Sequence, residues 1–142
     1  MPLDPAQYQA LAGFRLAMRR FLAAAEGISK SAGLTQAQYQ ALLAIKTWPS
    51  HAMTMGDLAE QLLLTHHGAV QLVDRMARVG VVERAPSQTD RRSVIVRLTP
   101  EGEAQMEALA ALHLREVLRQ EPQISRSLRR LRQLAQAPDT EA

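Results

Sequence analysis

The chain has 142 residues, of which 46% are hydrophobic and 22% charged, with a formal net charge of +3 and a sequence pI near 9.9. These values indicate one ordinary globular domain and exclude a disordered chain. No apolar run approaches the roughly 18 residues needed to cross a bilayer, and the first residues lack the pattern of a secretory signal. The absence of cysteine excludes disulfides and thiolate catalysis, and the cytoplasm is the simplest expected location.

A first helix is expected from about Pro5 to Lys30, closed by Gly33. Its apolar residues recur at spacings of three and four, which forms a seam that another helix can fill. Two interpretations stay open, a plain core helix or an interface between subunits. The seam consists of Leu11, Phe14, Met18, Phe21, Ala25 and Ile28.

Threonine is expected to cap the next three helices. Thr35 with Gln38, and Thr54 with Asp57, have the spacing of a reciprocal capping box, and Thr65 precedes the fourth helix. The stretch "TWPSHAM" ends the second helix because proline disfavours helix at the residue before it. The third helix is expected to run through Leu62, and the fourth from His66 to Val79, ended by Gly80.

Two β-prone runs follow, Val81 to Ala85 and Ser93 to Leu98, and they predict a hairpin. Pro86 suits a free hairpin edge. Thr99-Pro100 is a strong helix start, and that helix is expected to last to Arg119, where Glu121-Pro122 interrupts it. A final helix, about Gln123 to Ala137, turns Ile124, Leu128, Leu131 and Leu134 inward and Arg126, Arg129, Arg130 and Arg132 largely outward.

The predicted fold class is therefore mainly α with a small β-hairpin. Two short helices joined by a tight corner and followed by a hairpin have the order of a winged helix-turn-helix, whose second helix enters the major groove. In the fourth helix the residues that face outward include His66, His67, Gln71, Arg75 and Arg78.

The stretches "MGDLAEQLLLTHHGAVQLVDRMARVGVVER" and "TDRRSVIVRLTPEGE", between long helices, resemble the MarR family of bacterial transcription regulators. The resemblance implies a single domain over residues 1–142, with dimerisation helices at 5–33 and 100–138 and a DNA-binding region at 35–99. It implies a homodimer on pseudo-palindromic double-stranded DNA, with repression as the expected role and release by a small aromatic or lipophilic effector. The expected dimer contacts are Leu11, Phe14, Met18, Phe21, Leu128, Leu131 and Leu134.

The candidate DNA-binding residues lie at the start of the fourth helix, on its outer face and at the hairpin tip. The family resemblance implies that Arg92 reaches the minor groove, where negative potential attracts it. Asp90 is expected to brace the tip, through nearby backbone or an arginine such as Arg75. The full set is Thr65, His66, His67, Gly68, Gln71, Arg75, Arg78, Asp90, Arg91 and Arg92.

The sequence departs from the family at two places. Leu63 stands at the corner where the family usually has glycine, so the turn is expected to form without a residue free to adopt positive φ. The fourth helix begins His66-His67-Gly68-Ala69, which offers few long donors for base contacts, with Gln71 the best candidate for adenine.

Other functions have less support in the sequence. His66 and His67 are adjacent on a helix and cannot chelate one metal ion together, so no metal and no cofactor are expected. No G-x-S-x-G, glycine-rich phosphate loop or H-E-x-x-H occurs, which argues against a small hydrolase. A winged-helix adaptor for protein partners, with weak DNA binding, stays open. The basic segment "RSLRRLRQ" has three interpretations, a nucleic-acid surface, a membrane surface or the solvated rim of a dimer helix; no membrane partner is expected.

Overall fold

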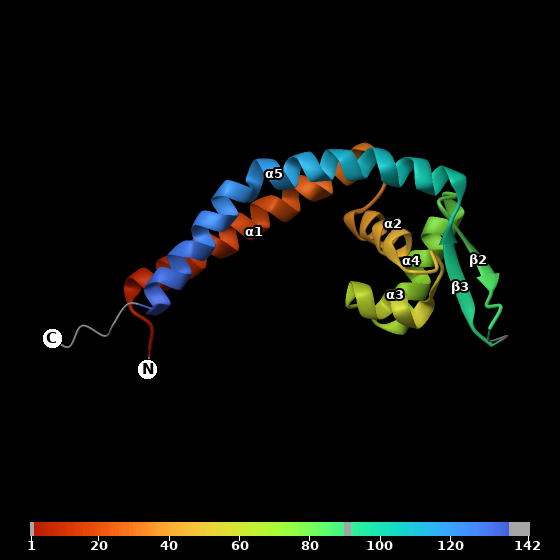
Figure 1. Ribbon diagram of the computed structural model, residues 1–142, viewed down its shortest axis with the longest axis horizontal. Helices are drawn as coiled ribbons and strands as arrows, with labels where there is room; N and C mark the ends of the chain where they lie inside the picture. The colour runs from red at the N-terminus through yellow and green to blue at the C-terminus, as the bar shows by residue number, and fades with distance from the viewer. Residues whose placement is uncertain (1, 90–91, 137–142) are drawn as a thin grey trace. The chain divides into compact units, whose positions relative to one another are not determined.

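The computed structural model describes residues 2–89 and 92–136, which fall into two compact units (Figure 1). The helical unit comprises Met1–Gly27 and His113–Ala142, and the winged-helix unit comprises Ile28–Leu112. The predicted fold class, mainly α with a small hairpin, is confirmed. The functional division into dimerisation helices and a DNA-binding region stays a prediction.

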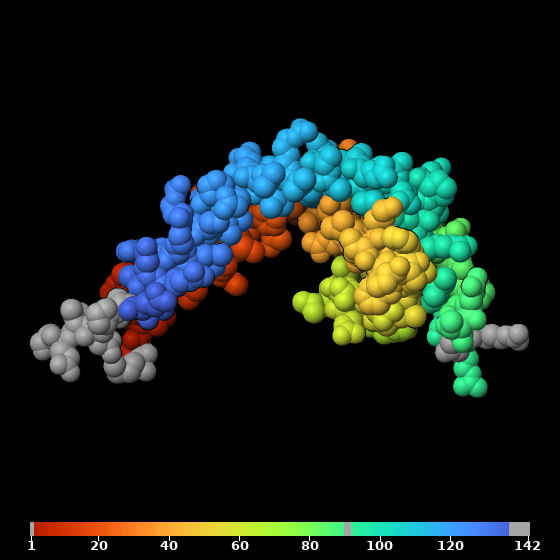
Figure 2. Space-filling model, in the orientation of Figure 1, coloured from red at the N-terminus to blue at the C-terminus, as the bar shows by residue number. Residues whose placement is uncertain are grey.

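The helical unit is built from α1 (Pro5–Ser31) and α5 (Pro100–Gln136), both of which also extend into the winged-helix unit. In the helical unit, α5 lies over α1, and the Gln7 amide donates a hydrogen bond to the Leu134 carbonyl at 3.4 Å (Figures 1 and 2). Ala17 and Ala25 are the buried apolar residues of α1. Small residues at such positions let two helices approach closely. Of the predicted seam, Ala25 is buried and Leu11 is exposed, so the seam is only partly covered within the chain.

The predicted interruption at Pro122 is wrong, because α5 continues through it to Gln136. Proline removes one backbone donor, so the Leu118 carbonyl loses its helical partner, at a cost of about 3 kcal/mol. The turns after Pro122 stay helical and pack through half-buried Ile124, Leu131 and Leu134. Tertiary packing of the flanking turns therefore outweighs the local preference of proline.

Three short helices form the centre of the winged-helix unit: α2 (Gln36–Thr47), α3 (Met55–Leu62) and α4 (His66–Arg78). Both predicted capping boxes are present: the Thr35 hydroxyl accepts from the Gln38 N–H, and the Thr54 hydroxyl accepts from the Asp57 N–H, each at 3.1 Å. Each box satisfies backbone donors that a helix start leaves without partners. The helix starts are therefore determined by local sequence.

The sheet has three antiparallel strands in the order β1-β3-β2, formed by β1 (Met53–Thr54), β2 (Val82–Pro86) and β3 (Val94–Leu98). The predicted hairpin is confirmed with bounds shifted by one residue, and Pro86 lies on an edge strand as expected. The two-residue strand β1 was not predicted, because two residues are too short to show an alternating pattern. Met53 pairs with Val96, which joins the hairpin to the start of α3.

One hydrophobic core lies between these helices and the sheet. It combines side chains from α2, α3, α4 and the strands with two from the first turns of α5, so the sheet and helices share a single interior. Its most deeply buried large members are Leu42, Ile45, Met53, Leu58, Val73, Met76, Val81, Val96 and Leu109.

The start of α5 packs directly on the chain that leaves α4. The Thr99 hydroxyl donates to the Gly80 carbonyl at 2.6 Å and accepts from the Gly102 N–H at 3.0 Å, while the Thr99 N–H donates to the Val81 carbonyl at 3.1 Å. A Cβ on Gly102 would lie 1.9 Å from the Val81 carbonyl oxygen. Only glycine therefore fits where α5 crosses the end of α4.

We expect Gly102→Ala to destabilise the fold by about 1–3 kcal/mol or more, because the backbone must move to relieve the overlap. Gly13→Ala is the matched control: both glycines are helical, but a Cβ at Gly13 meets nothing within 4 Å. The control should gain about 0.5–1 kcal/mol from helix propensity. Urea denaturation followed by circular dichroism measures both, and equal midpoints for the two variants would contradict the close approach.

Candidate nucleic-acid interface

One side of α4 is apolar and buried in the core, and this packing leaves the opposite, polar side exposed. Ala69, Leu72, Val73 and Met76 are buried in the core. On the other side His67, Gln71 and Arg75 recur every four residues and are exposed, together with Arg78. These residues face inward and outward as predicted, and a major groove admits an α-helix.

The first turn of α4 is held by Thr65, whose hydroxyl accepts from the Gly68 N–H at 3.0 Å. The hydroxyl of Thr65 is thus engaged as a helix cap, while His66 and His67 are exposed. A Cβ at Gly68 would lie 3.1 Å from that hydroxyl oxygen, so the glycine gives the cap room. The roles of Thr65 and Gly68 that the structure shows are structural.

The corner between α3 and α4 differs from expectation. Leu63 itself adopts the left-handed conformation, with φ 55° and ψ 41°, so the prediction of a turn without positive φ is wrong. The Leu63 N–H donates back to the Glu60 carbonyl and the Leu64 N–H to the Ala59 carbonyl, which closes the end of α3. The Leu63 side chain is 92% exposed. The corner therefore has glycine geometry with a leucine in it, at a cost of about 1–2 kcal/mol.

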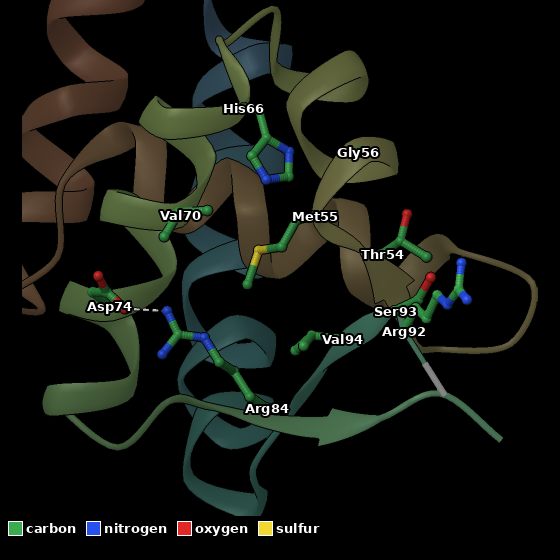
Figure 3. Close-up of a pocket in the computed structure, with 10 residues that line it drawn as sticks. All are labelled: Thr54, Met55, Gly56, His66, Val70, Asp74, Arg84, Arg92, Ser93 and Val94. Atoms are coloured by element: carbon green, nitrogen blue, oxygen red, sulfur yellow. Dashed lines mark hydrogen bonds and ion pairs between the residues drawn. The ribbon is translucent and has the colours of Figure 1, made fainter. Parts of the chain in front are cut away.

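A groove of about 670 Å³ separates α4 from the wing (Figure 3). His66 and Val70 form its α4 wall, Met55 lies at the start of α3 between the walls, and Val94 lies on β3. Its lining also includes polar residues from β1, α4, β2 and the end of the hairpin loop: Thr54, Asp74, Arg84, Arg92 and Ser93. The groove brings the predicted residues His66 and Arg92 to the edge of one concave surface.

An ion pair joins the two sides of this groove. Arg84 of β2 donates to the carboxylate of Asp74 on α4 (Figure 3). The hydrogen bond from Arg84 holds the pKa of Asp74 below its ordinary value. The sequence alone does not predict this pair. Arg84 is ten residues away, and only the turn after α4 brings it back to that face.

At the wing tip, serine and threonine hydroxyls organise the loop. The Ser87 N–H donates to the Ser93 carbonyl at 3.0 Å, and the Ser87 and Thr89 hydroxyls lie 3.1 Å apart. Arg92 is exposed at the end of this loop. Asp90 and Arg91 lie outside the described residues, so the expected bracing by Asp90 stays a prediction.

Residues 2–89 and 92–136 contain neither a candidate membrane span nor a candidate metal site. No helix there is both long and apolar enough to cross a membrane. Nor do three histidine, aspartate or glutamate side chains gather as metal ligands anywhere in those ranges.

A helix-turn-helix whose exposed second helix faces a β-wing across a groove defines the winged-helix class of DNA-binding folds. Residues 32–93 match the MarR family. This winged-helix segment therefore belongs to the MarR family, as the sequence resemblance predicted.

Individual curated proteins similar to this chain are also transcription regulators. The transcriptional activatory protein BadR of Rhodopseudomonas palustris is 36% identical over 84 residues, 58% of this chain and 48% of that protein. The chain thus spans about half the length of the curated relatives it matches.

Two solved structures share the fold. AbsC, a MarR family regulator from Streptomyces coelicolor, has a TM-score of 0.79 at 24% identity, covering 84% of this chain and 81% of that one. Sco3205 from the same organism, solved in complex with DNA, has a TM-score of 0.77 at 18% identity, covering 99% and 94%.

We expect Leu63→Gly to stabilise the winged-helix unit by about 0.5–1 kcal/mol, since relief of the left-handed leucine outweighs the entropy cost of glycine. Leu64→Gly is the control, because Leu64 follows directly and does not have positive φ. That variant should be less stable than wild type. Thermal melting compares the three proteins, and a Leu63→Gly midpoint below wild type would disprove strain at the corner.

Proposed function

We propose that this chain is a cytoplasmic transcription regulator that binds pseudo-palindromic double-stranded DNA as a homodimer, with repression as its role. The observation that carries the proposal is the exposed face of α4 beside a wing that ends in an exposed Arg92. An α-helix in the major groove and an arginine in the adjacent minor groove use the two kinds of readout that B-DNA offers. The DNA-bound relative with the same fold supports this use.

The dimer proposal rests on apolar side chains that the single chain leaves uncovered. Phe14, Met18, Phe21, Leu131 and Leu134 are half-buried within the chain, while Leu11 and Leu128 are 43% and 46% exposed. More exposed apolar residues lie on the same two helices, where a partner subunit could cover them. They are Leu16, Leu22, Leu114, Val117 and Leu118.

A two-fold dimer also explains how limited base contacts can suffice. Each α4 offers Gln71 as its longest neutral donor and acceptor, with Arg75 and Arg78 further along. A dimer on two half-sites about 34–36 Å apart makes every contact twice, and it selects only DNA in which the half-sites have that spacing. Phosphate contacts and groove shape then carry much of the specificity.

The runner-up is a winged-helix adaptor that binds a protein partner. The observation that favours it is charge: residues 28–112 contain eight arginines and lysines against eight acids, so this unit has no net charge. Phosphate binding usually draws on an excess of basic residues. A mobility-shift experiment with the DNA upstream of the chain's own gene separates the two functions, because the adaptor gives no sequence-selective shift.

Release by a small aromatic or lipophilic effector completes the proposal, on the basis of the family resemblance alone. Its test is the same mobility shift repeated with a panel of aromatic carboxylates. A compound that dissolves the complex without unfolding the protein supports an effector.

We expect Arg92→Ala to weaken binding to the selected operator roughly 30-fold or more, because a dimer loses two arginine contacts of about 1–3 kcal/mol each. Melting and dimerisation should be unchanged, since the side chain is exposed. Arg97→Ala is the control from the same hairpin, where Arg97 pairs with Glu83 at 2.7 Å. Fluorescence anisotropy that shows equal affinities for wild type and Arg92→Ala would exclude the wing tip from the interface.

We expect Leu128→Glu to shift the protein toward monomer, because a carboxylate replaces an apolar side chain that a partner would bury. Leu63→Glu provides the control, since Leu63 is the most exposed leucine and lies in the winged-helix unit. Sedimentation equilibrium at micromolar concentration reports both. A wild-type protein that sediments as a monomer would overturn the dimer.

A further inference from the structure

The positive charge of the protein is concentrated in the helical unit. The helical unit, Met1–Gly27 and His113–Ala142, contains nine arginines against six acids, a net charge of +3, whereas the winged-helix unit has none. The proposed DNA-reading surface is therefore not where the chain has its excess charge. The last helix, by contrast, carries more cationic groups than its own acids can pair.

Five of these arginines share one side of α5. At about 100° per residue, Arg115, Arg119, Arg126, Arg129 and Arg130 fall within a sector of about 100°, and we call this set the arginine stripe. All five are exposed. Along the helix axis the stripe extends for about 22 Å. Leu128, Leu131 and Leu134 lie on other sides of α5, so dimerisation through them leaves the stripe in solvent.

Among the residues that the structure describes, most of the stripe has no acidic partner. Arg119 donates to Glu116 at 2.9 and 2.6 Å, and this hydrogen bond, with one from Gln120, lowers the pKa of Glu116 to about 2. Within residues 2–89 and 92–136, Arg115, Arg126, Arg129 and Arg130 make no ion pair. Arg126 lies three and four residues before Arg129 and Arg130, so these like charges repel one another, and a bound anion would relieve the repulsion.

The chemistry of the stripe fits phosphodiester groups. A duplex presents about thirteen phosphates over 22 Å of its axis, and the guanidinium fork binds phosphate oxygens in pairs. Lipid surfaces are a poorer fit, because interfacial helices insert apolar and aromatic residues beside their basic ones. Pro122 lies among the arginines on this face, Gln123 and the exposed Leu118 border it, and α5 contains no Trp, Tyr or Phe.

We propose that the arginine stripe of α5 is a second, sequence-independent binding surface for the phosphate backbone of duplex DNA, separate from α4 and the wing. The choice of duplex rests on the proposed function, because a winged-helix unit that holds an operator keeps DNA at high local concentration around the stripe. The surface holds DNA without reading bases, and its binding weakens steeply with salt.

The experiment measures binding of the full-length protein to a random-sequence 40-base-pair duplex by fluorescence anisotropy between low and physiological salt. The stripe variant is R126Q/R129Q/R130Q, and the charge-matched control from the same unit is R15Q/R19Q/R20Q. We expect the slope of log affinity against log salt to become shallower by about three in the stripe variant, one for each lost phosphate contact. The control should keep the wild-type slope, and circular dichroism verifies that both variants fold.

Operator binding separates this surface from the proposed function. Arg92→Ala should lose selective binding while it retains salt-dependent binding to the random duplex, and the stripe variant should do the reverse. If no protein binds an operator selectively, the proposed function fails, whereas the random-duplex result still decides the stripe. Three results would each overturn the proposal. The stripe variant could keep the wild-type salt slope, or the control variant could lose as much of that slope as the stripe variant does. The wild-type protein could also bind phosphatidylserine vesicles more tightly than the duplex.

Discussion

The contact between the start of α5 and the chain that leaves α4 is the constraint on which the rest of the winged-helix unit depends. Thr99 binds Gly80 and Val81 through its hydroxyl and its N–H, and Gly102 permits the approach because it lacks a Cβ. Gly80 ends α4, Val81 precedes β2, and Thr99 follows β3. One small cluster of contacts thus fixes the end of α4, both strands of the wing and the direction in which α5 begins.

The Asp74–Arg84 ion pair extends that constraint to the surface. Core packing fixes the buried sides of α4 and the hairpin, but it does not determine how far their exposed edges stand apart. The charged pair across the groove adds a weak restraint on that spacing, because both side chains are partly solvated. Arg92 lies at the other end of the hairpin. The base of that hairpin contacts α4 through the Asp74–Arg84 pair and contacts the end of α4 through Thr99.

Local chemistry made most of the fold predictable. Caps at Thr35, Thr54 and Thr65 determine helix starts within a few residues, and the period of apolar residues separates the buried face of α4 from the exposed one. The errors at Pro122 and Leu63 share a cause. In both, packing of neighbouring segments outweighs the conformational preference of one residue, and that packing cannot be read from the residue itself. The Asp74–Arg84 pair was missed because pairing between a helix and a strand depends on the angle of the turn between them.

The neutrality of the winged-helix unit has a kinetic consequence. Electrostatic steering accelerates encounters only when an approaching polyanion feels a net attraction beyond a Debye length of about 8–10 Å. A unit whose charges cancel offers little of it, so α4 and the wing by themselves would meet DNA at the slower rate of unsteered association, about 10⁵–10⁶ M⁻¹s⁻¹. Under the proposed function and the proposed role of the arginine stripe, the long-range capture of DNA falls to the helical unit. The rate of finding a site and the accuracy of reading it are then properties of different parts of the chain, open to independent change by mutation.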